Sequence, residues 1–372
     1  MPSPAPIAAI LAEIRAEHVA LGSRPVRLME ICGGQTHAIL RYGLDTLLPT
    51  GVNLLHGPGC PVCVTPGSYL DRAIALARRP EVTLCAFGDL WRVPSDRSGD
   101  LFAAKARGAD VRMVTSPLQV LDLAAAEPTR EVVFLAIGFE TTAPANALAI
   151  QLARRRGLGN VSFLVSQVLL PPAIRRIAGA AGGPDAFLAA GHVCTVTGEE
   201  PYRQLAAETG RPIAITGFSP EEILLGIAAA LRLLRQREAH PEVPAGLFNA
   251  YPASVHPAGN PEALRLIDDT FSVCDQNWRG LGLLPASGLA IRVEFASLDA
   301  GRRFPEAAPD YPEPIPAAAP VSSCLADQIL MGLALPTDCP HFGRDCTPLS
   351  PLGAPMVSAE GACSAFHLHR RR

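Results

Sequence analysis

Short apolar runs alternate with helical patterns from residue 26 to residue 216, and this alternation constrains the fold more than any other feature of the sequence. Because parallel strands must be joined by crossover connections, which are usually helices, the pattern predicts α/β architecture with a largely parallel sheet arrangement. The expected strands are Val26–Ile31, Val52–Leu55, Val82–Phe87, Val111–Thr115, Val132–Ile137, Val161–Val165, Ala189–Val193 and Ile213–Thr216. The expected helices between them are Ala38–Leu48, Ser68–Arg79, Leu118–Ala126, Ala143–Arg155, Pro172–Ala180 and Pro201–Glu208.

Eight strands in one run could form a single sheet, but the break near residues 125–128 favours two similar α/β units. The polar break at residues 125–128 separates them, so we place one domain at residues 22–126 and a second at residues 127–240. Residues 241–372 form a smaller C-terminal domain, in which the proline-rich stretch Arg302–Pro320 is a linker because proline cannot continue a helix or join a central strand. Before the first strand, Pro6–Leu21 carries apolar residues at helical spacing and is followed by Gly22, which predicts an amphipathic helix.

Composition and charge exclude several classes of protein. The chain has 32 basic and 35 acidic residues, and a net charge of -3 argues against a nucleic-acid surface. Its apolar runs are shorter than the roughly 18 residues that a membrane span requires. Glu13, Arg15 and Glu17 interrupt the apolar core that a signal peptide would need. We therefore expect a cytoplasmic protein, whose ten cysteines are metal ligands or redox groups rather than structural disulfides.

Three cysteines follow two of the expected strands directly. Cys32 comes after Val26–Ile31, while Cys60 and Cys63 come after Val52–Leu55. The carboxyl ends of strands in open parallel sheets are where ligands and reactive groups collect. Cys60 and Cys63 also precede an expected helix, whose N-terminus would stabilise a thiolate and make a readily oxidised dithiol. The alternative is that the two are a buried pair of small apolar side chains.

Other residues near strand ends are weaker candidates when taken alone. Cys32 is followed by two glycines that allow close approach, and by Thr36 and His37 as possible donors. The turn at Gly138–Pro144, which contains Glu140 and Thr141, offers free backbone N–H groups that could hold an anion, but taken alone it is better explained as an ordinary capped turn. The residues assigned instead to the core, because they have no partner nearby in sequence, are Cys85, Cys194, Cys274, His192 and His256.

Four further cysteines lie in a short, turn-rich segment after the linker. Cys324, Cys339, Cys346 and Cys363 are separated by fourteen, six and sixteen residues. Four thiolates can complete the coordination of a structural zinc ion or of an Fe–S cluster. Zinc ligands usually come as close pairs, so this wide spacing favours a [4Fe–4S] cluster, although zinc, or cysteines that are merely scattered in a loop, are alternatives. Val321–His367 has few apolar residues, and we expect the metal centre to hold it together.

These motifs resemble those of the HypD family, scaffold proteins of [NiFe]-hydrogenase maturation. The resemblance runs nearly from end to end. It is carried by Cys32-Gly-Gly-Gln-Thr-His37, Gly57-Pro-Gly-Cys-Pro-Val-Cys63, Gly138-Phe-Glu-Thr-Thr142, Trp278-Arg-Gly-Leu-Gly282 and Met356-Val-Ser-Ala-Glu-Gly-Ala-Cys363. The chain departs from the family pattern at Ala253, where arginine is common, and at Ser95-Asp96, where Gly-Ser is more usual.

The resemblance implies a fold, cofactors and partners. It implies two related α/β domains and a third domain that holds a [4Fe–4S] cluster through the four C-terminal cysteines, with residues 1–21 packed on that third domain. Cys32 would hold the iron that receives one CO and two cyanide ligands, giving Fe(CN)2CO. Cys60 and Cys63 would be a redox-active pair able to exchange electrons with the cluster. His37, Glu140, Thr141 and Glu360 match further motif positions.

The implied partners are the small chaperone HypC, in a stable complex, and HypE, which carries the cyanide precursor, in a transient one. By itself the chain is expected to be a monomer and an assembly scaffold with redox activity rather than a conventional turnover enzyme. The leading alternative is a cluster-dependent thiol–disulfide reductase that acts on a protein substrate. A third interpretation is a zinc-stapled binding module with no redox role.

Overall fold

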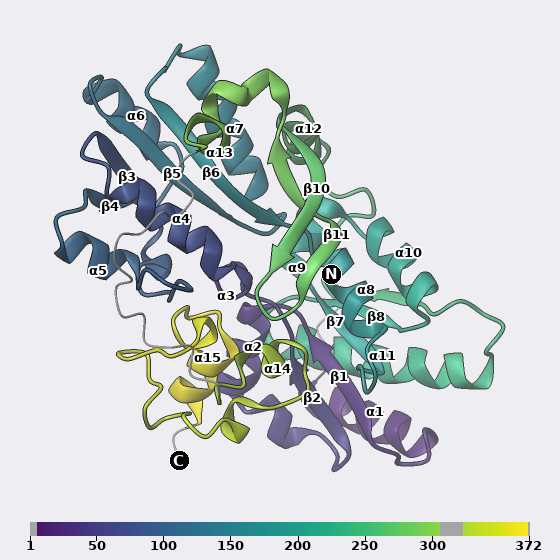
Figure 1. Ribbon diagram of the computed structural model, residues 1–372. Coiled ribbons are helices and arrows are strands. Elements are labelled where there is room, and N and C mark those ends of the chain that lie inside the picture. Colours follow the sequence, from purple (N-terminus) through teal and green to yellow (C-terminus); the bar gives the residue numbers. More distant parts are fainter. Residues whose placement is uncertain (1–5, 306–322, 371–372) are drawn as a thin grey trace.

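The computed structural model describes residues 6–305 and 323–370, in which the strands form two separate sheets (Figure 1). The first sheet is entirely parallel and has the order β2 (Val52–His56), β1 (Val26–Glu30), β7 (Ala186–Ala190), β8 (Ile213–Thr216) and β9 (Leu247–Asn249). The second has the order β10 (Phe271–Trp278), β11 (Gly282–Ile291), β6 (Val161–Val168), β5 (Glu131–Gly138), β3 (Val82–Ala86) and β4 (Val111–Met113). In it, β3 to β6 are parallel and the hairpin β10–β11 is antiparallel. The predicted α/β class with largely parallel sheets is confirmed.

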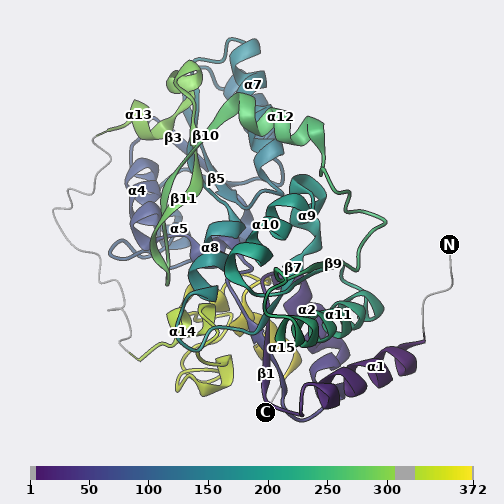
Figure 2. The same cartoon turned by 90° about the vertical axis from the view of Figure 1, so that its right-hand side faces the viewer.

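Helices connect the strands and cover the faces of both sheets (Figure 2). Those up to β7 are α1 (Ile7–Ala20), α2 (Gly33–Tyr42), α3 (Pro61–Val64), α4 (Gly67–Ala77), α5 (Leu101–Ala106), α6 (Gln119–Ala126), α7 (Ala143–Arg155) and α8 (Leu170–Ala178). Those after β7 are α9 (Gly191–Thr197), α10 (Glu200–Thr209), α11 (Pro220–Ala239), α12 (Pro261–Thr270), α13 (Ala300–Arg303), α14 (Ala326–Leu330) and α15 (Ala362–His369). Within the described ranges, none of these helices is long and apolar enough to cross a bilayer.

Sheet membership does not follow the domain boundaries expected from the sequence. The chain leaves the first sheet after β2, builds β3 to β6 of the second, returns for β7 to β9, and leaves again for β10 and β11. The expected boundary at residues 126 and 127 lies between β4 and β5, which belong to the same sheet. The polar break there is only the connection from α6 to β5. Each sheet is therefore assembled from separated parts of the chain. The ranges 22–126, 127–240 and 241–372 are each continuous, and as domains they stay a prediction from the sequence.

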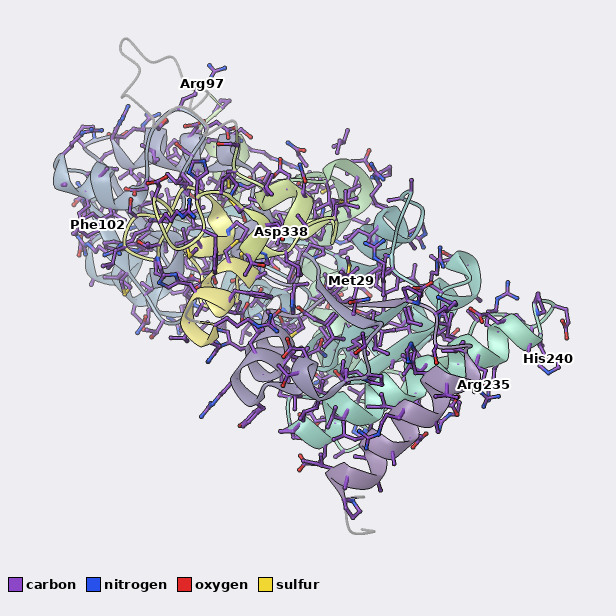
Figure 3. The ribbon with its side chains drawn as sticks, turned by 90° about the horizontal axis from the view of Figure 1, so that it is seen from below. Met29, Arg97, Phe102, Arg235, His240 and Asp338 are labelled. Carbon is purple, nitrogen blue, oxygen red and sulfur yellow. A yellow bond between two sulfur atoms is a disulfide. The ribbon has the colours of Figure 1, made fainter. Side chains whose placement is uncertain are left out.

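The N-terminal helix forms as predicted but packs elsewhere than the resemblance implied. Its main partner is α11 of the first α/β unit (Figure 3) rather than the C-terminal cysteine segment. Ile10 and Ile14 are buried against that unit. Arg232 Nη1 donates to Glu13 Oε1 at 2.9 Å and Arg235 Nε donates to Glu17 Oε2 at 2.6 Å. The apolar stripe of α1 thus covers α11, and the ion pairs fix the register at the surface, where each contributes little.

Only some of the residues assigned to the core are buried. Cys85 and Cys194 are fully buried. Cys274 is half-buried because β10 is an edge strand, and His256 is exposed in the loop after β9. His192 is also only half-buried and lies beside Cys32, as described below.

Candidate functional site

Cys32 lies where β1 ends and α2 begins. It is the N-cap residue of α2, with extended backbone, and only 1% of its surface is exposed. Its Sγ lies 3.4 Å from Nδ1 of His192, which opens α9 after β7. The backbone N–H groups of Gln35 and Gly34 point at the thiol and favour the thiolate. Burial outweighs them and raises the pKa of Cys32 well above its usual range.

Glu30, the last residue of β1, is the buried carboxylate beneath this thiol. Its Oε2 accepts a hydrogen bond from the backbone N–H of Cys32 at 2.8 Å. Its Oε1 accepts from the hydroxyl of Thr36 and lies 2.7 Å from Nδ1 of His56, the last residue of β2. Glu30 therefore joins the ends of two strands to the first turn of α2. Its negative charge further raises the pKa of Cys32.

At two glycines of the motifs, backbone atoms of other segments lie so close that no side chain would fit. A Cβ on Gly59 would lie 2.4 Å from the backbone nitrogen of Cys32. A Cβ on Gly33 would lie 2.2 Å from the carbonyl oxygen of Glu360, in the C-terminal segment. The backbone N–H of Gly33 donates to the carbonyl of Gly59 at 3.0 Å. These contacts hold the loop after β1, the loop after β2 and the C-terminal segment against one another.

His37 is not directed at Cys32, although the sequence suggested it as a donor there. Its Nε2 lies 2.5 Å from the carbonyl oxygen of Ala359. Its Nδ1 lies 3.0 Å from Nε2 of His369 at the end of α15. His37 therefore ties α2 to the segment that carries the last of the C-terminal cysteines.

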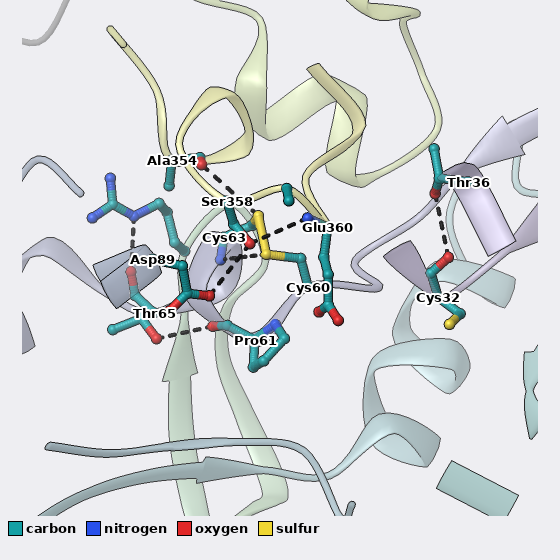
Figure 4. The surroundings of a disulfide bond; sticks show 12 residues. Cys32, Thr36, Cys60, Pro61, Cys63, Thr65, Asp89, Ala354, Ser358 and Glu360 are labelled. Atoms are coloured by element: carbon teal, nitrogen blue, oxygen red, sulfur yellow. Dashed lines mark hydrogen bonds between the residues drawn. A yellow bond between two sulfur atoms is a disulfide. The ribbon is translucent and has the colours of Figure 1, made fainter. Parts of the chain in front are cut away.

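Cys60 and Cys63 are joined by a disulfide across α3, next to the loop of Cys32 (Figure 4). Both are buried, at 2% and 0% exposure. Cys60 Sγ accepts from the backbone N–H of Cys63 at 3.1 Å, and Cys63 Sγ lies 3.9 Å from the carbonyl oxygen of Ala354. In Figure 4 the disulfide lies beside Ser358 and Glu360, and the sulfur of Cys32 points away from it. The three thiol groups that the sequence placed together thus form two distinct centres.

The four C-terminal cysteines are free and surround one apolar region. Burial raises the pKa of Cys363, and the charges of Cys346, Cys324 and Cys339 raise it further. Burial likewise raises the pKa of Cys324, with further contributions from Cys339 and Cys346. The backbone N–H of Leu352 donates to Cys346 Sγ at 3.4 Å. The apolar neighbours include Leu40, Ile329, Phe342, Met356 and Phe366.

The chemistry of these four thiols is compatible with an Fe–S cluster. Four thiols with an N–H donor and apolar walls are the donor set and surroundings that such clusters use. Within residues 6–305 and 323–370, no group of three His, Cys, Asp or Glu side chains is placed so that it could hold a metal ion as it stands.

Glu140 follows β5 of the second sheet and is buried in the same interior as Cys32. It is 4% exposed; its Oε1 accepts from the backbone N–H of Leu170 at 3.0 Å, and its Oε2 has no hydrogen-bond partner among the described residues. Burial raises its pKa to about 7. Its negative charge raises the pKa of Cys194 and that of Tyr202, and a charge on Cys32 acts on both in the same direction. Thr141 is half-buried, and it is Thr142 that closes the turn, donating to the carbonyl of Phe139 at 3.1 Å.

The raised pKa of Glu140 predicts a pH dependence of stability. Between pH 4.5 and about 7 the folded chain holds this proton and the unfolded chain releases it. The contribution of Glu140 to stability therefore falls as the pH rises through that window, by ~3 kcal/mol at most, and is constant above it. Glu140→Gln removes the titrating group. The free energy of unfolding of the variant, relative to that of the wild type, should therefore increase by up to that amount between pH 4.5 and pH 8. Chemical denaturation at both pH values measures this, with the exposed Glu294→Gln as control; equal pH profiles for wild type and Glu140→Gln would contradict it.

His192 is the site residue that sequence reasoning missed. We expected a strand at Ala189–Val193, which would have buried His192 within the sheet. The strand ends instead at Ala190, so His192 lies at the carboxyl end of β7, next to β1. The strand-end rule that selected Cys32 and Cys60 would have selected His192 as well, had the end of β7 been placed correctly.

Comparison with known proteins identifies the family of this chain. The HypD family model, described as "Hydrogenase formation hypA family", matches residues 6–370. The chain belongs to the HypD family. It is 45% identical over 358 residues to the hydrogenase maturation factor HypD of Rhizobium leguminosarum bv. viciae, covering 94% of this chain and 89% of the relative. It is 42% identical over 362 residues to HypD of Escherichia coli (strain K12), covering 96% and 93%. The resemblance read from the motifs is thus confirmed, and this HypD-family chain is a hydrogenase maturation factor.

Proposed function

We propose that this chain, in a stable complex with the small chaperone HypC, holds the iron on which the Fe(CN)2CO group of [NiFe]-hydrogenase is assembled. Cys32 is the protein ligand of that iron. The Cys60/Cys63 pair supplies reducing equivalents next to it, and the C-terminal cysteines hold a [4Fe–4S] cluster. HypE binds transiently and delivers cyanide.

The observation that carries the proposal is the setting of Cys32. It is a free, buried thiol that is separate from the disulfide and faces an imidazole and two backbone N–H groups. A soft thiolate suits a low-spin ferrous iron that takes strong-field ligands such as cyanide and CO. Because its pKa is raised, the thiol keeps its proton until a metal displaces it. A protonated thiol is also slow to oxidise.

The C-terminal segment contacts the dithiol turn directly. Gly353 packs on Cys324, since a Cβ there would lie 3.2 Å from its Sγ, and the next residue, Ala354, carries the carbonyl that faces Cys63. Two adjacent residues thus separate one of the four thiols from the disulfide. A [4Fe–4S] cluster held by Cys324, Cys339, Cys346 and Cys363 would supply single electrons at this contact. The protein's own part is to hold the four thiols and the disulfide in fixed proximity.

Partner chains complete the site under this proposal. Cys32 is one thiolate, and iron that is being loaded needs further ligands and access for the donor of cyanide. We assign these to HypC and HypE, which act on this chain as a monomer in the cytoplasm. Glu360 and Gly33 mark the edge of the site, where the C-terminal segment meets the first turn of α2.

The alternative function, a free-standing reductase of protein disulfides, fits the structure less well. The Cys60–Cys63 pair is almost fully buried beneath the C-terminal segment, so a substrate protein could not reach either sulfur without opening that contact. Scaffold and reductase are separated by assaying the anaerobically purified chain, without HypC, on a protein disulfide such as insulin. The scaffold predicts reduction at the uncatalysed rate in this assay, and co-purification of HypC when the chain is instead isolated from cells that contain HypC. Catalytic turnover without HypC would contradict it.

A further inference from the structure

The tip of the β10–β11 hairpin reaches the disulfide turn, and Arg279 makes the contact. Its backbone N–H donates to the carbonyl of Val64 at 2.7 Å. Its Nε donates to the carbonyl of Thr65 at 2.8 Å, and its Nη2 donates to the carbonyl of Pro94 at 2.8 Å. Arg279 thus binds the carbonyls of the two residues that follow Cys63 and joins them to the loop that contains Pro94.

The hairpin is anchored so that this contact is fixed. Trp278 is 1% exposed and its Nε1 donates to Ser287 Oγ at 3.0 Å. Gly280 packs on α14 of the C-terminal segment, since a Cβ there would lie 3.3 Å from the Cα of Asp327. The tip therefore lies between the disulfide turn and the segment that carries Cys324.

Arg279 brings a positive charge into a poorly solvated place. Its hydrogen bonds go to carbonyl oxygens, while Asp96, Asp327 and Asp71 attract the guanidinium through space. Burial lowers the pKa of Arg279, yet a guanidinium remains protonated at neutral pH. Burial also weakens solvent screening, so the charge acts on groups several ångströms away more strongly than it would in water.

We propose that Arg279 is a positioning residue that sets the redox equilibrium of the Cys60/Cys63 pair, by holding a cation against the end of the turn that carries it. The inference rests on the proposed redox role of that pair. Reduction takes two electrons and two protons and converts the disulfide into two thiols, with an added dithiol such as dithiothreitol as the reductant. When one of the new thiols ionises, the cation stabilises the thiolate and favours the reduced form.

The test is a redox titration of the whole chain in dithiothreitol buffers, with the Cys60–Cys63 peptide quantified by alkylation and mass spectrometry. Arg279→Met removes the charge and should shift the equilibrium toward the disulfide by roughly tenfold at pH 8.5, which is about 30 mV for a two-electron couple. Because the cation acts on the thiolate, the shift should be smaller at pH 6.5, where less thiolate forms. Arg279→Lys keeps the charge and should titrate close to the wild type at both pH values. Arg292→Met is the matched control, because Arg292 is exposed at the far end of the same hairpin and donates to the carbonyl of Asp268 in α12.

The outcomes separate this inference from the proposed function. Equal titrations of Arg279→Met and wild type at pH 8.5, or an equal shift at both pH values, would overturn the role of the charge. If Arg279→Met does not fold, Arg279→Gln, which keeps hydrogen-bond donors without the charge, is titrated in its place. A wild-type disulfide that no buffer reduces would instead overturn the redox role of Cys60 and Cys63, and the inference with it.

Discussion

Cys32→Ala should reduce the iron bound beyond the C-terminal cluster to background while leaving the visible absorption of the cluster unchanged. Cys32 is the buried thiol of its centre and points away from the disulfide. Its replacement removes one sulfur from a site that backbone contacts at Gly33 and Gly59 hold in shape. Losing so small a group costs about 1 kcal/mol in stability, so the variant should fold. Metal analysis and absorption spectra of the anaerobically purified chain with HypC measure both quantities.

Cys274→Ala is the matched control for this experiment. Cys274 is half-buried on the edge strand β10 and belongs to none of the three cysteine groups: Cys32, the Cys60–Cys63 disulfide, and the four C-terminal cysteines. Its replacement should leave iron content and spectrum as in the wild type. Retention of the extra iron by Cys32→Ala would contradict the assignment of Cys32.

Cys339→Ala should abolish the [4Fe–4S] absorption and destabilise the C-terminal segment by several kcal/mol. The segment has a small apolar cluster, and a metal centre that binds only the folded form adds its binding free energy to stability. Because Ala354 of this segment lies against Cys63, loosening the segment should also expose the disulfide. Absorption spectra and limited proteolysis of residues 323–370 measure the two effects, with Cys274→Ala as control. An unchanged visible spectrum would remove Cys339 from the ligand set.

Most strands of the two largely parallel sheets were predictable from the sequence because the central ones, such as β3 and β5, are buried on both faces. Each of β1 to β6 and β8 overlaps an expected strand, since continuous apolar runs bounded by turns leave few alternatives. The hairpin β10–β11 was not expected. Its strand β10 lies at a sheet edge and exposes much of its length, so its sequence lacks the apolar run that marked the others.

Which strands share a sheet could not be read from the chain. The crossings after β2, β6 and β9 depend on how helices and strands pack over long sequence separations, as when β1 pairs with β7 at Leu28 and Ala186. A local composition change such as the one at residues 125–128 carries no information about such pairings. The same is true of α1, whose apolar stripe predicts burial but not its partner, α11.

The candidate site was partly predictable for the same reasons. Cys32 and Cys60 were found because motif and strand end coincide, and Glu140 because it follows β5. His192 was missed through an error of three residues in one strand end. His37 was placed wrongly because its position in the first turns of α2 does not fix its direction; the C-terminal helix, which is distant in sequence, does.

The most direct test of the central claim is the infrared spectrum of the wild-type chain purified anaerobically with HypC from cells that carry the other maturation proteins. If Cys32 holds the iron of the nascent Fe(CN)2CO group, the complex should show stretching bands of both cyanide and CO, and these should be absent from the Cys32→Ala complex. A wild-type complex with a full cluster but no such bands, or bands that persist in Cys32→Ala, would contradict the account.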